Sequence, residues 1–280
     1  MKKFLAVFDG YNLSKSTLSY AIQLTQAANA HLVGVFLDEL IYRNYNVEKA
    51  IKKPGDYRET IKELDAKDKL KRDEAAKQFQ KVCSKARIQF SIHRQKGIAL
   101  NELKHESMFA DLIVINEFET FTRFKQPSPT RFMKDLLADV QCPVLVVPDV
   151  YKAVDKIVLL YNGEPSSLYA IKIFSYLFGD FSGIPVEVFV VQENINAAAR
   201  VPDNKLMREF IKRHFPKAVY IVVKGIAKEQ IAGHLRNHKE NELVVLGAYR
   251  RNELSRWFKI SMADVLMNEL DTPLFIAHNK

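Results

Sequence analysis

The most constraining feature of the sequence is that its two halves repeat one another. A lysine-glycine-isoleucine-alanine stretch recurs unchanged, and in each half an unbroken apolar run leads through a loop and a helical segment to a second apolar run. A repeat this long indicates two copies of a domain rather than a solenoid of short units. The clearest matches are 96–99 with 224–227, 112–115 with 243–246, and 7–10 with 160–163.

Each half alternates short apolar runs with amphipathic segments. Strands that alternate with helices of roughly 10–15 residues predict parallel βαβ units with right-handed crossovers. We expect two domains, residues 1–148 and 156–280, joined by a polar linker at 149–155. The expected strands are 4–8, 31–37, 90–93, 112–115 and 144–147 in the first domain, and 157–161, 186–191, 219–223, 243–246 and 274–277 in the second.

The first half contains a segment that the second half lacks. The matched stretches are further apart at the start of the repeat than later in it, so the additional residues follow the second strand of the first half. We place this insertion at about 38–75. Residues 57–86 are expected to form one long, densely charged helix, but the pattern does not say what the insertion does.

Composition excludes several classes of protein. At 280 residues with 48% hydrophobic residues, the chain can bury two cores. No apolar stretch approaches the roughly 18 residues of a membrane helix, and the apolar run after Lys2 and Lys3 is too short for a secretory signal. Two cysteines exclude a disulfide framework and fit a reducing cytosol. The net charge of +9 permits anion binding, but lysines on solvated helix faces give the same total.

The order of these features resembles the universal stress protein family over essentially the whole chain. Each half has an acid or amide after its first strand, within 7–10 and 160–163, and a loop after its fourth that ends at Thr130 or Ser261. The first half also ends in the Cys-Pro-Val-Leu-Val-Val run at 142–147. The resemblance implies an α/β fold of two tandem doubly wound domains with five-stranded parallel sheets, adenine-nucleotide alpha hydrolase-like. It further implies a cytoplasmic location and abundance under stress.

The family resemblance also implies that the two halves pair through their last strands. Exposed edge strands invite such pairing, and the apolar residues that would meet are Val144, Val146, Leu274 and Ile276. We therefore expect an internal pseudo-dimer. A further homodimer is compatible with the sequence, which does not specify one.

Many members of this family bind ATP at the carboxyl ends of the strands. In those members an aspartate after strand one helps to hold the adenine, and the loop after strand four carries three glycines before a serine or threonine. Glycines let the backbone approach the phosphates, and the amides at the helix start complete the cradle. Each half of this chain can be compared with that pattern.

The second half keeps part of the nucleotide pattern. Gly247 and Ser261 remain, but Arg250 and Ile260 replace the second and third glycines. A β-branched isoleucine is a poor occupant of a position that needs a positive φ or close phosphate approach. Asn162 replaces the aspartate, so it can hydrogen-bond an adenine without bringing a charge. Arg250 and its basic neighbours could bind an anion through their side chains, or they could form a solvated loop.

The first half keeps less of the pattern. Asp9 is present and Thr130 precedes the helix, but the loop between has no glycine. Pro129 has no amide hydrogen to offer a phosphate, and Glu117 and Glu119 would repel one. We therefore expect Asp9 to be a structural turn residue.

Other catalytic or metal chemistry is weakly signalled. His234 and His238 lie one helical turn apart, but no third ligand is evident, so we expect no metal site and solvent-facing histidines. Cys83 and Cys142 are expected to be packing residues.

We expect a largely or wholly non-catalytic tandem protein that acts in stress response through a partner or small ligand, with a degenerate nucleotide site and no required cofactor. One alternative is a protein that binds ATP or AMP and hydrolyses ATP slowly through its second half. Another is a binder of nucleic acid or an acidic partner through the basic loop 249–259, with an affinity that falls steeply with salt. Tyr249 and Trp257 make a poor stacking platform.

Overall fold

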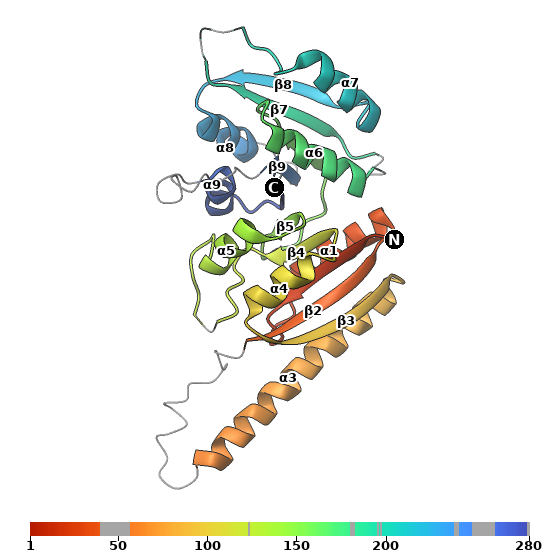
Figure 1. Cartoon of the computed structure of the whole chain (residues 1–280), viewed down its shortest axis with the longest axis vertical. Coiled ribbons are helices and arrows are strands. Elements are labelled where there is room, and N and C mark those ends of the chain that lie inside the picture. Colours follow the sequence, from red (N-terminus) through yellow and green to blue (C-terminus); the bar gives the residue numbers. More distant parts are fainter. Residues whose placement is uncertain are drawn as a thin grey trace.

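Strands and helices alternate along the chain in the computed structural model, as the sequence predicts (Figure 1). The structure describes residues 1–39, 57–122, 124–179, 183–194, 196, 198–237, 241–247 and 261–278. The first half forms β1 (Lys3–Phe8), α1 (Lys15–Ala28), β2 (His31–Glu39), α3 (Tyr57–Lys85), β3 (Gln89–Gly97), α4 (Ala99–Ser107), β4 (Leu112–Asn116), α5 (Arg131–Asp139) and β5 (Val144–Val147). The second half forms β6 (Lys156–Leu160), α6 (Pro165–Leu177), β7 (Val186–Gln192), α7 (Asn204–His214), β8 (Val219–Lys224), α8 (Ala227–Asn237), β9 (Glu242–Gly247), α9 (Met262–Glu269) and β10 (Leu274–Ala277).

The strands of the described residues form one ten-stranded sheet in the order β3-β2-β1-β4-β5-β10-β9-β6-β7-β8. Neighbouring strands are parallel except for β5 and β10. Each half therefore has the doubly wound, five-stranded parallel arrangement that the sequence predicts. The strand order reverses between β1 and β4, and again between β6 and β9. Doubly wound folds bind ligands in the crevice at the carboxyl ends of such strands.

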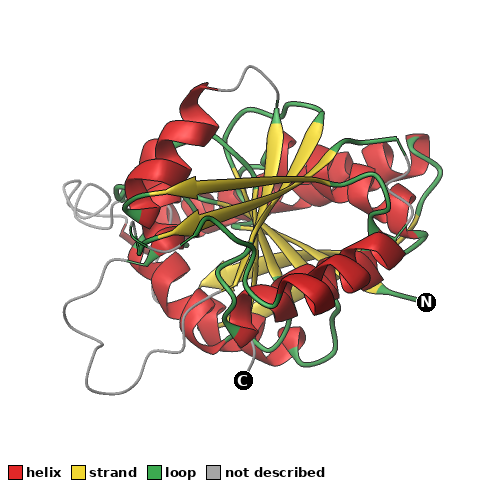
Figure 2. Ribbon diagram, turned by 90° about the horizontal axis from the view of Figure 1, so that it is seen from above, coloured by secondary structure: helices red, strands yellow, loops and turns green. Residues whose placement is uncertain are grey.

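Both faces of the sheet are covered by helices, as Figure 2 shows. Along β1, Phe4, Ala6 and Phe8 face one core, and Leu5 and Val7 face the other. This alternation is why a strand buried on both sides reads as a continuous apolar run. The first core contains residues of α1, α3, α6 and α7, and the second contains residues of α4, α5, α8 and α9.

The two halves join where β5 and β10 pair in antiparallel orientation. Val146 is opposite Leu274, and Val144 is opposite Ile276. All four side chains are at most 2% exposed. Each strand would otherwise present an unpaired apolar edge, so the pairing covers both edges and makes one continuous sheet.

The helix of the insertion differs from its counterpart in the second half. α3 has 29 residues, whereas α7 has 11. The helix packs through Phe79, whose ring lies against Gly34 of β2, where an added Cβ would stand 2.7 Å from the ring. Its amino-terminal part extends beyond the sheet (Figure 1). β2 itself continues through Glu39, which pairs with Gly97, so the additional residues begin after it.

None of the helices in the described ranges combines the length and the apolar character that crossing a membrane requires.

Candidate functional site

The first crevice begins at the turn that follows β1. Asp9 Oδ1 accepts hydrogen bonds from the backbone N–H groups of Tyr11 and Asn12, each at 2.9 Å. An aspartate that binds the backbone two residues on is a common way to close a turn. Gly10 lies inside the turn with a φ of +79°, a conformation that glycine adopts without strain. The Asp9 carboxylate is therefore engaged by its own loop.

Arg72 of α3 covers this turn. Its guanidinium forms an ion pair with Asp38 and a hydrogen bond to the Tyr11 hydroxyl, and lies 4.4 Å from the centre of the Tyr11 ring. The Tyr11 hydroxyl in turn donates a hydrogen bond to Asp68 at 3.2 Å. A Cβ atom on Gly10 would stand 3.7 Å from the Arg72 side chain. α3 is thus tied to the turn that follows β1 and to the end of β2.

A second carboxylate, that of Glu119, stands beside Asp9. Glu119 Oε1 accepts hydrogen bonds from the N–H groups of Thr120 and Phe121, at 3.0 and 3.1 Å. Burial raises the pKa of Glu119 to about 7, and the Asp9 charge adds to this effect. Burial also raises the pKa of Asp9, although the Asn12 and Tyr11 amides and the Arg72 charge oppose it. In its ionised form, either carboxylate would repel a phosphate.

Thr130 caps the amino terminus of α5, directly before its first residue, where the sequence places it. Its Oγ1 atom accepts a hydrogen bond from the Met133 N–H at 3.1 Å and donates one to the Glu119 carbonyl oxygen at 2.7 Å. The side chain is fully buried. Both hydrogen-bonding directions of the hydroxyl are used inside the protein, so it has no donor left for a ligand.

The turn after β6 repeats this arrangement in the second half. Asn162 Oδ1 accepts a hydrogen bond from the Glu164 N–H at 3.0 Å. Gly163 follows with a φ of +86°, and a Cβ atom there would stand 2.7 Å from Pro202. Pro202 belongs to the segment that leads into α7. The glycine of the strand-one turn is therefore in contact with a distant segment in both halves, with Arg72 in one and with Pro202 in the other.

Gly247, at the end of β9, is surrounded by backbone. A Cβ atom at this position would stand 2.3 Å from the Ser166 carbonyl oxygen and 2.6 Å from the Ser167 nitrogen. Those atoms belong to the first turn of α6. Glycine is required here because strand and helix approach each other closely, whether or not a phosphate binds nearby.

Ser261 begins α9 in a capping box. Its Oγ atom accepts a hydrogen bond from the Asp264 N–H, and the Asp264 carboxylate accepts one from the Ser261 N–H, each at 3.1 Å. The box satisfies two of the free amides at the helix start. The Asp264 carboxylate also places a negative charge at the helix start, where a phosphate would bind. This charge interacts favourably with the positive end of the helix dipole. Arg250 and Ile260, in the loop that precedes this helix, lie outside the described residues.

Glu117 marks the junction between the halves. Its side chain is only 4% exposed, and its Oε1 atom has no hydrogen-bond partner among the described residues. Burial raises the pKa of Glu117 to about 7, and the charges of Asp271, from the second half, and Asp149, from the linker, raise it further. Asp149 itself accepts a hydrogen bond from the Asn116 amide at 2.9 Å. Sequence reasoning saw Glu117 only as a barrier to phosphate.

The expectation that His234 faces solvent is wrong. The ring stacks on Phe189 with 4.1 Å between centroids, and its Nε2 atom is bonded to the Glu187 carboxylate. Lys156 completes the cluster, at 2.7 Å from Glu187 and 3.3 Å from Glu242. α8 packs against β7 through this face of the helix, so the histidine side chain is largely covered and only 15% exposed. No local pattern signals the glutamate that meets it.

The described residues contain no group of three or more histidine, cysteine, aspartate or glutamate side chains able to hold a metal ion. His238 lies outside the described residues. Cys83 and Cys142 are both buried and unpaired with each other, as packing residues are. Burial raises the pKa of each thiol to about 12, which makes both poor nucleophiles.

The architecture defines a class of protein, a tandem doubly wound α/β protein with two five-stranded parallel halves. A universal stress protein from Archaeoglobus fulgidus DSM 4304 superposes with a TM-score of 0.70 and 16% identity, over 99% of this chain and 98% of that one. A functionally unknown protein from Pseudomonas aeruginosa PAO1 gives 0.61 and 13%, over 99% and 92%. A third structure, from Pseudomonas aeruginosa UCBPP-PA14 and named for the same family, gives 0.56 and 14%, over 99% and 93%.

This chain therefore has the fold of the tandem universal stress proteins. No protein-family model matches the sequence, and no curated protein matches it either. The fold confirms the resemblance read from the sequence, while the identities are too low to transfer a ligand.

Proposed function

We propose that this protein is a tandem universal stress protein that acts without catalysis, through a partner or a small ligand, and that its nucleotide crevices are too degenerate to hold ATP. One observation carries the proposal. Every described residue that matches the nucleotide pattern either forms hydrogen bonds within the protein or packs against its backbone. These residues are Asp9, Thr130, Asn162, Gly247 and Ser261.

Charge supports the same conclusion. A phosphate oxygen about 4 Å from an ionised carboxylate is repelled by about 4 kcal/mol near a protein surface. A hydrogen bond from one amide to a charged group contributes only about 1.5–3 kcal/mol. Asp264 stands at the start of α9, where this repulsion applies. Glu119 stands beside Asp9 and repels a phosphate less near neutral pH, because its pKa is raised to about 7 and it is only partly ionised there. The sequence of the first loop, 116–129, has no glycine, and the second half keeps only Gly247 of the three, so fewer positions allow the backbone to approach a phosphate closely.

Isothermal titration calorimetry of the full chain with magnesium-ATP, and separately with AMP, tests the proposal. We expect no saturable binding below a dissociation constant of about 1 mM, which corresponds to about −4 kcal/mol. Mass spectrometry should detect no adenylate released from freshly purified protein after denaturation.

Micromolar ATP binding that is abolished by Ser261→Ala or by Arg250→Ala would overturn the proposal and favour an ATP-binding role for the second half. A hydrolysis assay with wild type and Ser261→Ala would then separate binding from turnover. We also propose a cytoplasmic location, which cell fractionation checks. Light scattering would show whether the chain forms a further homodimer, which the sequence does not specify.

A further inference from the structure

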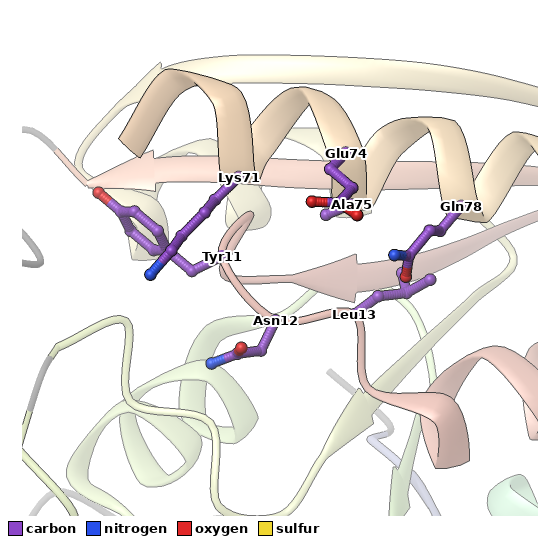
Figure 3. A pocket seen from close by; sticks show the side chains of 7 residues that line it. All are labelled: Tyr11, Asn12, Leu13, Lys71, Glu74, Ala75 and Gln78. Carbon is purple, nitrogen blue, oxygen red and sulfur yellow. The ribbon is translucent and has the colours of Figure 1, made fainter. Parts of the chain in front are cut away.

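A hollow of about 420 Å³ lies between α3 and the loop that joins β1 to α1 (Figure 3). We call it the α3 pocket. Lys71, Glu74 and Gln78 project into it from one face of the helix, and Asn12 and Leu13 lie opposite. Its volume falls within the roughly 300–1,000 Å³ typical of small-molecule sites.

Both walls of the α3 pocket are held in place by contacts outside it. On the loop side, the amides of Tyr11 and Asn12 are bonded to Asp9. On the helix side, Phe79 is fully buried against β2. A pocket that exists before its ligand arrives loses less entropy on binding.

The α3 pocket presents one positive and one negative charge, those of Lys71 and Glu74, for which the described residues supply no ion pair within 4 Å. Lys71 and Glu74 are nearly one helical turn apart, and within the described part of the chain neither takes part in an ion pair or a side-chain hydrogen bond. Lys71 acts electrostatically on Asp68, which is bonded to Tyr11 instead. Side chains spaced this way on a helix have Cβ atoms about 5–6 Å apart.

This charge pattern selects a class of ligand by exclusion. An anion such as a phosphate would meet Lys71 but be repelled by Glu74, and a simple cation would have the opposite difficulty. A molecule with one carboxylate and one ammonium group can pair with both charges. It should therefore bind more tightly than a singly charged molecule, which is attracted by one side chain and repelled by the other. The side-chain amides of Asn12 and Gln78 add donors and acceptors, and Leu13 and Ala75 supply apolar surface for a short aliphatic stem.

We propose that the α3 pocket binds a free α-amino acid, with the carboxylate of the ligand at Lys71 and its ammonium group at Glu74. An amide-bearing side chain fits best, because it can exchange hydrogen bonds with the amides of Asn12 and Gln78. This inference rests on the proposed function in one respect, since it names the class of small ligand through which the protein acts.

The test is a nuclear magnetic resonance titration of the full chain with L-glutamine. We expect saturable shifts confined to the amides of 11–13 and 71–78. Lys71→Gln and Glu74→Gln should each weaken binding about tenfold, because each removes one charged hydrogen bond. The matched controls Lys77→Gln and Glu63→Gln change exposed residues of the same helix outside the pocket and should leave binding unchanged. All four positions are exposed, so the variants should fold.

Two analogues sharpen the result. N-acetyl-L-glutamine lacks the ammonium charge and L-glutamine amide lacks the carboxylate, so each should bind about tenfold more weakly than L-glutamine. Absence of saturable shifts overturns the inference, and so does equal weakening by the control variants or equal binding of the analogues. The two proposals fail separately, because ATP binding would overturn the non-nucleotide role without producing any L-glutamine response at this pocket.

Discussion

A Cβ atom on Gly247 would stand 2.3 Å from the carbonyl oxygen of Ser166, so β9 and α6 pack backbone against backbone at this point. This glycine is the residue of the second loop that most suggests a nucleotide site when the sequence is considered alone. In the folded chain its absent side chain makes room for a helix.

Gly247→Ala should therefore reduce the free energy of unfolding by about 1–3 kcal/mol, the usual range for overpacking. The matched control is Gly233→Ala within α8, where no atom lies within 4 Å of the added Cβ. That change should stabilise the helix by up to about 1 kcal/mol, because alanine is the better helix former. Urea denaturation measures both effects. A neutral Gly247→Ala variant would contradict the packing role.

Replacement of Asp9 tests whether this residue serves its turn. Asp9→Asn keeps a carbonyl oxygen that can accept the amides of Tyr11 and Asn12, as Asn162 does for Glu164 in the second half. We expect it to change stability by less than about 0.5 kcal/mol. Asp9→Ala removes the acceptor and should cost about 1–2 kcal/mol. Thermal unfolding distinguishes the two, and equal losses in both variants would show that the charge rather than the turn matters.

The pH dependence of stability should carry the signature of Glu117. Its pKa is raised from 4.5 to about 7 in the folded protein, so the folded state keeps a proton that the unfolded state has released. Stability from this group is complete below pH 4.5 and is lost as the pH rises through about 7. A rise in pKa of this size corresponds to a loss of roughly 3 kcal/mol. Glu117→Gln cannot ionise, so its unfolding free energy should fall less across this range.

Urea unfolding of wild type and Glu117→Gln at a series of pH values from about 5 to 8 measures this difference. Asp271→Asn serves as the companion variant, because removing the Asp271 charge should lower the pKa of Glu117 and narrow the affected pH range. Parallel pH profiles for wild type and Glu117→Gln would refute the assignment. The same loop carries Glu119, whose own replacement would reveal any separate contribution.

Removal of the Lys156 charge should destabilise the protein more than removal of the Lys3 charge in the first half. Lys156 neutralises Glu187 and Glu242, whose side chains are 6% and 3% exposed. Lys156→Met leaves both glutamates without this cation, and we expect a loss of about 3 kcal/mol. Lys3 pairs with the more accessible Glu106, at 28% and 11% exposure, so Lys3→Met should cost about 1 kcal/mol or less. Adding Glu242→Gln to Lys156→Met should restore part of the loss. Equal losses for the two lysine variants would contradict the prediction.

Elements with a strong local pattern were predicted well. The charged segment expected as a helix over 57–86 is α3, Tyr57–Lys85, because its buried positions recur at helical spacing. The apolar run at 243–246 is the core of β9. The fold class followed from the order of such segments, since alternating strands and helices leave few topologies.

The candidate site was predicted less completely. The sequence shows directly that glycines are replaced in both loops and that the loop of the first half is acidic. That Arg72 and Pro202 cover the two strand-one turns was not, because each reaches its turn from a distant segment. His234 was missed for the same reason, since its partner Glu187 lies 47 residues away.

By itself the sequence determined the duplication, the alternation of strands and helices, and the replacement of most residues that would cradle a triphosphate. These depend on local spacing and residue type, which a chain carries whether folded or not. Only the tertiary structure decided which side chains lie against the strand-one turns, which glycine is a packing residue and which carboxyl groups keep their protons near neutral pH. Burial and long-range contact set those properties, and neither exists until the halves have folded and met along β5 and β10.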